Sequence, residues 1–190
     1  MSLHHFISYS FADPKAEAFA LQLADALQAG PPSIPVWLYK RESQAGIAWD
    51  TQIVEAIRSC ETLLFIMTRD SVMDQSGCKQ EWMRALKYKK PVIPLRLHTD
   101  AELPYRLEPR QRIDFTGDFK TSLARLREHL QWRTSPAGVL HSLQERFADA
   151  QYAMGRPHDA AQTVRIEDDL AQLQKQIAEQ QRVADDPEAA

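Results

Sequence analysis

The first two thirds of the chain alternate between short apolar runs and longer segments in which apolar residues recur every three or four positions. Short runs are typical of β-strands, and the recurring spacing is typical of amphipathic helices. The predicted strands cover His5–Tyr9, Val36–Tyr39, Thr62–Thr68, Pro91–Leu97 and Gln111–Phe115. Predicted helices separate the first four strands and follow the last one, with apolar positions within residues 16–27, 49–60, 78–88 and 119–130.

Local signals refine these boundaries. Asp13 is a candidate N-cap, and Pro14 suits the first position of the helix that follows. The almost continuously apolar segment Thr62–Thr68 predicts a strand that is buried on both faces and therefore central in a parallel sheet. The two prolines of Pro91–Leu97 predict interrupted hydrogen bonding there. The polar stretch Lys40–Gly46 predicts an exposed loop.

Strands that alternate with helices through short connections require right-handed crossovers and helices on both faces of a parallel sheet. The predicted fold is α/β, a flavodoxin-like five-stranded parallel sheet. In such sheets the loops at the carboxyl ends of the strands surround the binding crevice. We therefore expect Ser10–Asp13, Lys40–Trp49 and Arg69–Glu81 to lie around one site.

The pattern changes after Trp132, where Thr134–Pro136 is a candidate linker. Beyond it, two helices are marked by Leu140, Leu143, Phe147 and Met154, and by Ile166, Leu170, Leu173 and Ile177. The second set forms a narrow coiled-coil-like seam, too short to be stable alone. We predict a domain over residues 1–132 and a helical extension over 133–190. The extension is either a hairpin that folds on itself or a short coiled coil that docks on a neighbour, and it is a candidate linker to further domains.

Composition and charge narrow the function classes. With 190 residues, 44% hydrophobic and 26% charged, the chain resembles an ordinary globular protein. The net charge of -3 divides into 17 basic and 16 acidic residues through Trp132, and 6 basic and 10 acidic residues after it. Neither part has the excess of basic residues that is typical of nucleic-acid-binding proteins. No apolar run approaches the length of a membrane span.

We expect a cytoplasmic protein with no metal site. Cys60 and Cys78 lie among apolar residues and are interpreted as two free thiols of a reducing compartment. The residues before the first predicted strand leave no room for a signal peptide. The histidines and cysteines form no metal-ligand spacing.

Four segments, in the expected order, resemble motifs of TIR (Toll/interleukin-1 receptor) domains, and the likeness extends over residues 6–130. Phe6–Ser10 resembles the first sequence box of the family. The others are Gly46 with Trp49, Ile53, Ala56 and Ile57; the set Ser71, Ser76, Cys78 and Glu81; and the strand Lys90–Leu95. TIR domains are scaffolds that assemble with one another or enzymes that cleave NAD, and many bacterial members do both. Gly77 departs from the pattern, because many members have tryptophan there.

The resemblance implies an NAD glycohydrolase, of the bacterial NAD-cleaving type, that releases nicotinamide and ADP-ribose, or a cyclic isomer, on self-assembly. Bacterial anti-phage defence or immune-type signalling would be its setting. The alternative is a non-catalytic adaptor that acts through homotypic TIR–TIR contacts; a third hypothesis is processing of another nucleotide. NAD is then the substrate, so no cofactor is expected.

The resemblance assigns the catalytic role to Glu81. Glycosidases ordinarily need two carboxylates, one of which protonates the leaving oxygen. Nicotinamide is already cationic and leaves as a neutral base, so a single carboxylate that stabilises the oxocarbenium-like ribose is sufficient. Without this context, Glu81 would be interpreted as a solvated glutamate near a helix N-terminus.

The other candidate site residues are assigned to substrate binding. Ser10 and Phe11 would line the pocket, Lys40 and Arg41 would meet the pyrophosphate, and Trp49 would stack on a ring unless it faces the core. Ser76 and Cys78 complete the set. A nucleophilic role for Cys78 is disfavoured because no histidine is suitably placed. Ser8 and Tyr9 are interpreted as strand residues with local hydrogen bonds.

Overall fold

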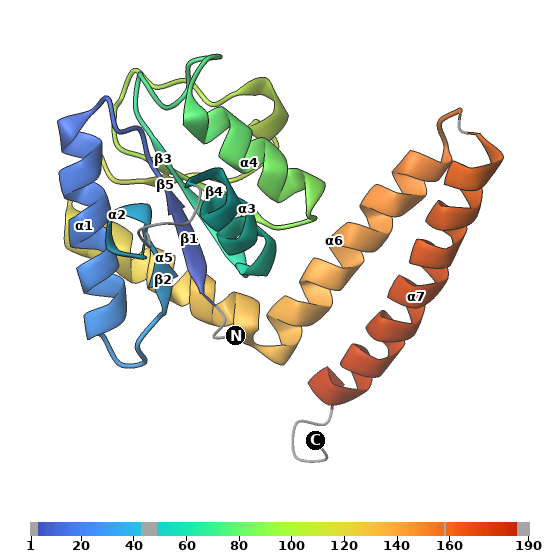
Figure 1. The fold of residues 1–190 in the computed structure, drawn as a ribbon. Helices are drawn as coiled ribbons and strands as arrows, with labels where there is room; N and C mark the ends of the chain where they lie inside the picture. Colours follow the sequence, from blue (N-terminus) through green and yellow to red (C-terminus); the bar gives the residue numbers. More distant parts are fainter. Residues whose placement is uncertain (1–3, 43–48, 158, 186–190) are drawn as a thin grey trace. The chain divides into compact units, whose positions relative to one another are not determined.

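The computed structural model describes residues 4–42, 49–157 and 159–185, and for Trp49 the backbone alone. The chain divides into two compact units, Met1–Leu126 and Arg127–Ala190. The elements of the first unit are β1 (His5–Ser8), α1 (Pro14–Ala29), β2 (Val36–Trp37), α2 (Tyr39–Glu42), α3 (Trp49–Ser59), β3 (Thr62–Met67), α4 (Gly77–Lys87), β4 (Val92–Arg96), a 3-10 turn η1 (Tyr105–Leu107) and β5 (Ile113–Asp114) (Figure 1). Helix α5 (Phe119–Thr134) continues into the second unit, which also holds α6 (Pro136–Met154) and α7 (Ala160–Asp185).

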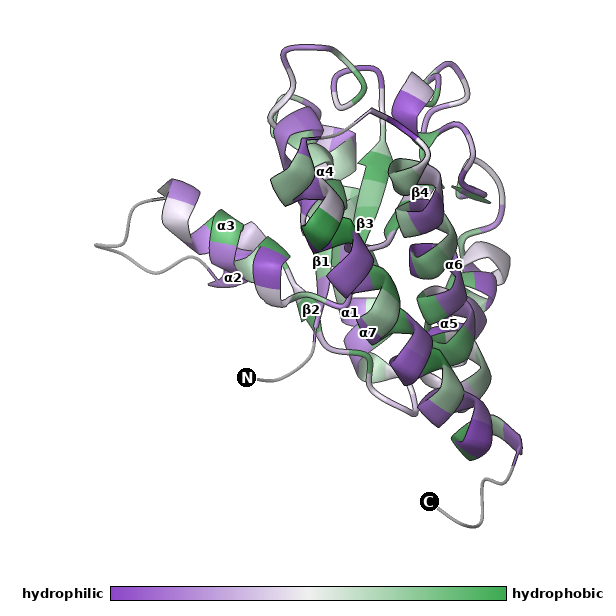
Figure 2. Ribbon diagram, turned by 90° about the vertical axis from the view of Figure 1, so that its right-hand side faces the viewer, coloured by the Kyte–Doolittle hydropathy of each residue, from purple (hydrophilic) through white to green (hydrophobic). Residues whose placement is uncertain are grey.

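The sheet is parallel throughout, with the strand order β2-β1-β3-β4-β5. This is the flavodoxin-like order, so the predicted fold class is confirmed. β3 occupies the central position and all six of its residues are buried. Its apolar character along the whole strand is visible in Figure 2. The order reverses between β1 and β3, which places the ends of these two strands beside a crevice.

Helices cover both faces of the sheet. Alternate residues of a strand point to opposite faces, and Leu63, Phe65 and Met67 of β3 join a core cluster with side chains from α3 and α4. On the other face, the Phe19 ring of α1 contacts the rings of Phe115 and Phe119. The carboxyl end of the sheet is left for loops.

Strand β5 covers only Ile113–Asp114 of the expected Gln111–Phe115, and two neighbouring segments earlier in the chain also differ from the sequence-based prediction. Strand β2 ends at Trp37 rather than Tyr39, because the carbonyl of Leu38 accepts hydrogen bonds from the amides of Arg41 and Glu42 and starts a helical turn. Residues 39–42 of the expected loop therefore form α2, while 43–48, including Gly46, lie outside the described residues.

The prolines around β4 are accommodated by its register. Pro91 precedes the strand, which begins at Val92. Pro94 is paired opposite Phe65 of β3, whereas β5 pairs only with Leu95 and Arg96. A residue without an N–H is tolerated here because no strand on the β5 side faces it.

The second unit contains a helical hairpin in which α6 and α7 pack together. The expected linker is reduced to one residue between α5 and α6, because Ser135 caps α6 by accepting a hydrogen bond from the Gly138 amide at 3.2 Å. Gly138 is buried against the end of α5: a Cβ atom there would lie 2.0 Å from the Trp132 carbonyl oxygen. This close approach requires glycine.

We predict that Gly138→Ala lowers the free energy of unfolding of the helical unit by about 2 kcal/mol, because the new methyl group displaces backbone. Hydrogen exchange of the α6 amides measures the change. Gly155→Ala is the matched control: its φ is -71° and its Cβ would meet the Tyr152 carbonyl at 3.6 Å, an ordinary contact. Equal exchange rates in the two variants would contradict the prediction.

Candidate functional site

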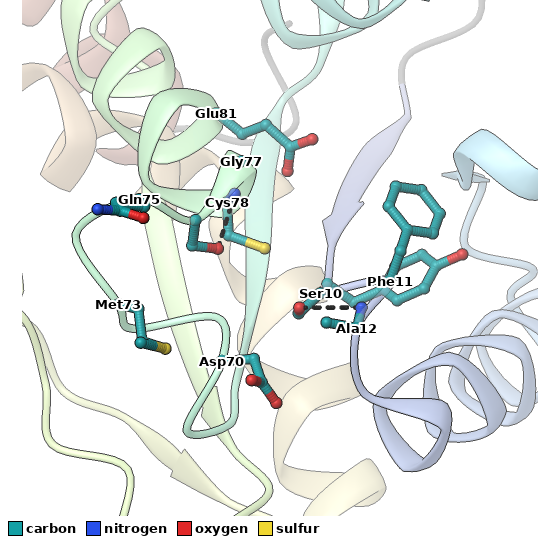
Figure 3. Close-up of a pocket in the computed structure, with 11 residues that line it drawn as sticks. Ser10, Phe11, Ala12, Asp70, Met73, Gln75, Gly77, Cys78 and Glu81 are labelled. Atoms are coloured by element: carbon teal, nitrogen blue, oxygen red, sulfur yellow. Dashed lines mark hydrogen bonds between the residues drawn. The ribbon is translucent and has the colours of Figure 1, made fainter.

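A pocket of about 380 Å³ opens at the carboxyl ends of β1 and β3 (Figure 3). Two loops and the first turns of α4 form its walls. The lining residues are Tyr9, Ser10, Phe11, Ala12, Asp70, Met73, Gln75, Ser76, Gly77, Cys78 and Glu81. The pocket therefore lies where the strand order reverses, as expected for a flavodoxin-like sheet.

One wall is the loop between β1 and α1. Asp13 is buried and caps α1, with its carboxylate accepting hydrogen bonds from the amides of Lys15 and Ala16. This cap fixes the loop at its far end. At its tip the Phe11 side chain is 51% exposed, although its ring contacts that of Tyr9 at 4.9 Å between centroids. The loop thus presents an aromatic surface at the pocket mouth.

The opposite wall is the loop between β3 and α4. Ser71, fully buried, closes a turn in which its hydroxyl accepts from the Thr68 amide at 2.8 Å. Ser76 then caps α4 by accepting from the Cys78 amide at 3.2 Å. Because this cap sets where the helix begins, it also sets the direction in which Cys78 and Glu81 extend from α4 (Figure 3).

Glu81 is the central acidic group of the pocket. The Ser8 hydroxyl donates a hydrogen bond of 2.5 Å to Glu81 Oε2. Burial raises the pKa of the Glu81 carboxyl to about 7, while the Ser8 hydrogen bond and the Arg84 charge act in the opposite direction. At neutral pH both the carboxylate and the acid are therefore populated.

Cys78, beside it, remains a neutral thiol at neutral pH. Burial and the charge of Glu81 raise the pKa of Cys78 to about 12. A thiol with this pKa is a poor nucleophile. Cys60, the other free cysteine, is buried in the core cluster away from the pocket lining.

The structure brings together five of the predicted site residues: Ser10, Phe11, Ser76, Cys78 and Glu81 all line the pocket. Lys40 and Arg41 do not. Lys40 forms an ion pair with Glu17, and Arg41 pairs with Asp25 at 2.8 Å. The side chain of Trp49 lies outside the described residues.

Sequence reasoning missed part of the lining. Asp70, Met73 and Gln75 lie within the turn-rich segment that was expected near the site, but nothing in their spacing distinguished them. The interpretation of Ser8 was wrong, because its hydroxyl reaches Glu81, 73 residues further along, rather than a local group. One feature of the sequence could have indicated a distant partner for Ser8. Its polar side chain lies two residues after Phe6, and therefore on the same face of a buried strand.

The lining carries two carboxylic acids, Asp70 and Glu81, and no lysine or arginine among its residues. Such an arrangement favours a cationic or neutral ligand group over a phosphate. Within the described residues, no three His, Cys, Asp or Glu side chains are arranged to hold a metal ion. The helices among those residues include none with the length and apolarity needed to cross a membrane.

The family model for the TIR domain matches residues 6–128, which is most of the chain. The chain belongs to the TIR domain family. Among curated proteins the comparison found no match.

Solved structures confirm the fold of this TIR domain. A metazoan TIR-STING receptor from C. gigas in complex with 2′,3′-cGAMP superposes with a TM-score of 0.54 at 20% identity, over 66% of this chain and 38% of that one. The TIR domains of the activated Roq1 resistosome give 0.52 at 14% identity, covering 68% and 99%. A prokaryotic SEFIR domain gives 0.50 at 19% identity, covering 67% and 97%.

We predict that Glu81→Gln stabilises the TIR domain at pH 8 by about 3 kcal/mol and changes its stability little at pH 4. The folded-state pKa of Glu81 is raised to about 7. In the unfolded chain the pKa of Glu81 is 4.5, so between pH 4.5 and 7 the carboxyl group is ionised in the unfolded chain but still protonated in the folded one. The free energy of unfolding of the wild type therefore falls as the pH rises through this interval. Urea denaturation at the two pH values measures the difference.

The control is Glu102→Gln, which alters an exposed glutamate of the same unit. An equal pH dependence in wild type and Glu81→Gln would show that this carboxyl group does not resist ionisation.

Proposed function

We propose that this TIR domain is an NAD glycohydrolase with Glu81 as its catalytic residue. What supports the proposal is a carboxyl group at the crevice of a parallel sheet, hydrogen-bonded by Ser8 and titrating near neutral pH. A pocket with perturbed ionisable groups is the expected form of an active site.

The reaction breaks the bond between C1′ of the ribose and the nicotinamide nitrogen. The electron pair of that bond goes to the pyridinium ring, so nicotinamide leaves neutral and no general acid is required. Positive charge develops on the ribose, where the ionised Glu81 stabilises it. Water then adds to C1′ and releases a proton, for which Glu81 is the adjacent base. The products are nicotinamide and ADP-ribose; attack by a group of the substrate itself gives a cyclic isomer.

The pocket suits the nicotinamide riboside half of NAD. Its two carboxylic acids attract the pyridinium cation, and the exposed ring of Phe11 offers a stacking surface. Lys40 and Arg41 are assigned to the pyrophosphate. They must first leave Glu17 and Asp25, which costs little because ion pairs between exposed side chains contribute about 0–1 kcal/mol.

The proposed active form is an assembly of TIR domains, and the proposed setting is bacterial anti-phage defence or immune-type signalling in the cytoplasm. Family likeness supports this part. An adaptor that acts through TIR–TIR contacts alone is the alternative, and it requires no chemistry at Glu81.

We expect concentrated wild-type protein to release nicotinamide from NAD, and Glu81→Ala to reduce the rate on the order of a hundredfold or more. Nicotinamide is quantified by chromatography over a series of protein concentrations, with Glu102→Gln as the matched control. No release from concentrated or deliberately clustered wild type would favour the adaptor. Equal rates in wild type and Glu81→Ala would remove Glu81 from the mechanism.

We also expect kcat/KM to fall about tenfold per pH unit below pH 7, because only the ionised Glu81 stabilises the ribose cation. The pKa of Glu81, raised to about 7, sets the midpoint. The profile is measured between pH 5 and 9. A flat profile across pH 6–8 would exclude titration of this group in the rate-limiting step.

A further inference from the structure

Ser8 is the last residue of β1, and its hydroxyl is buried. Its exposure is 1%, and it is not among the residues that line the pocket. Yet its hydroxyl donates the 2.5 Å hydrogen bond to Glu81 Oε2. The group that contacts Glu81 therefore acts from behind the pocket wall.

The backbone holds Ser8 rigidly. It is paired with Phe65 of the fully buried central strand β3. Its side chain points to the same face as Phe6, which is part of the core cluster under α3 and α4. A hydroxyl fixed on a strand restricts the position of its partner far more than a hydroxyl on a loop does.

Cys78 lies close to the same carboxyl group, because the charge of Glu81 contributes to the raised pKa of this thiol. The pKa of about 12 keeps Cys78 a neutral thiol at neutral pH. The Ser8 hydroxyl has one proton, and it donates this proton to Glu81 Oε2. The Ser8–Glu81 hydrogen bond is therefore the contact through which β1 acts on the carboxyl group.

We propose that Ser8 is the positioning residue of the active site: its buried hydroxyl fixes the rotamer of Glu81 and favours the ionised carboxylate that faces the ribose. This inference rests on the proposed NAD cleavage. It gives Ser8 of β1 a role in the reaction, although Ser8 is not among the residues that line the pocket.

Ser8→Ala tests it. We expect kcat to fall about tenfold, because the carboxylate is no longer held in place, with KM within about twofold of wild type. Loss of a donor to the carboxylate raises the pKa of Glu81, so the acidic limb of the kcat/KM profile moves up by about one pH unit. Ser122→Ala, which removes a buried hydroxyl that donates to the Asp114 carbonyl, is the control for general loosening.

A matched pair keeps the test valid if the alanine variant folds poorly. Ser8→Thr and Ser8→Val add equal volume and differ only in the hydroxyl. We expect the threonine variant to retain the wild-type pH profile and most of kcat, and the valine variant to behave as Ser8→Ala. Equal profiles in this pair would overturn the proposal.

A second readout needs no activity. Titration of ¹³C-labelled glutamate by NMR, with the Glu81 signal assigned by its loss in Glu81→Gln, follows the pKa directly. An unchanged titration in Ser8→Ala overturns the inference while leaving NAD cleavage intact. If clustered wild type releases no nicotinamide, the proposed function fails and Ser8 has no reaction to serve, even where the titration shifts.

Discussion

The constraint on which this site depends is the placement of a carboxyl group at the border between an apolar core and a pocket. One turn of α4 carries Cys78 and Trp82 into the core cluster, and Glu81 lies between them at the pocket. A charge in such a position loses hydration that its protein neighbours replace only in part. The hydrogen bond from Ser8 of β1 offsets this loss only in part, so the site is held at some expense of stability.

The topology explains why that bond is possible. Ser8 and Glu81 are 73 residues apart, but β1 and β3 are adjacent and parallel, so the end of β1 meets the helix that follows β3. The reversal of strand order at this point keeps a crossover from covering the crevice. The same geometry brings the Phe11 loop opposite the start of α4. The two walls of the pocket are thus brought together by strand order rather than by nearness in sequence.

The sequence predicted the architecture well because its signals were local and strong. The continuous apolar run of β3 and the Asp13 cap each depend on a few neighbouring residues, and both were confirmed. It predicted α2 poorly, because one turn nucleated by the Leu38 carbonyl leaves no periodic pattern. The Ser8 contact was out of reach for a different reason: periodicity identifies the buried face of a strand, but not which distant polar group meets it.

The same limit applies to Lys40 and Arg41. Charge alone made them candidates for a pyrophosphate, yet each lies beside an acidic residue of α1, Glu17 and Asp25. An ion pair between a basic side chain on the surface and the nearest carboxylate contributes little to the free energy of folding. These ion pairs therefore do not prevent Lys40 and Arg41 from binding other anionic groups. The pocket differs, because Glu81 is carried by α4 and accepts a hydrogen bond from Ser8 of β1, so the position of this carboxyl group is part of the fold.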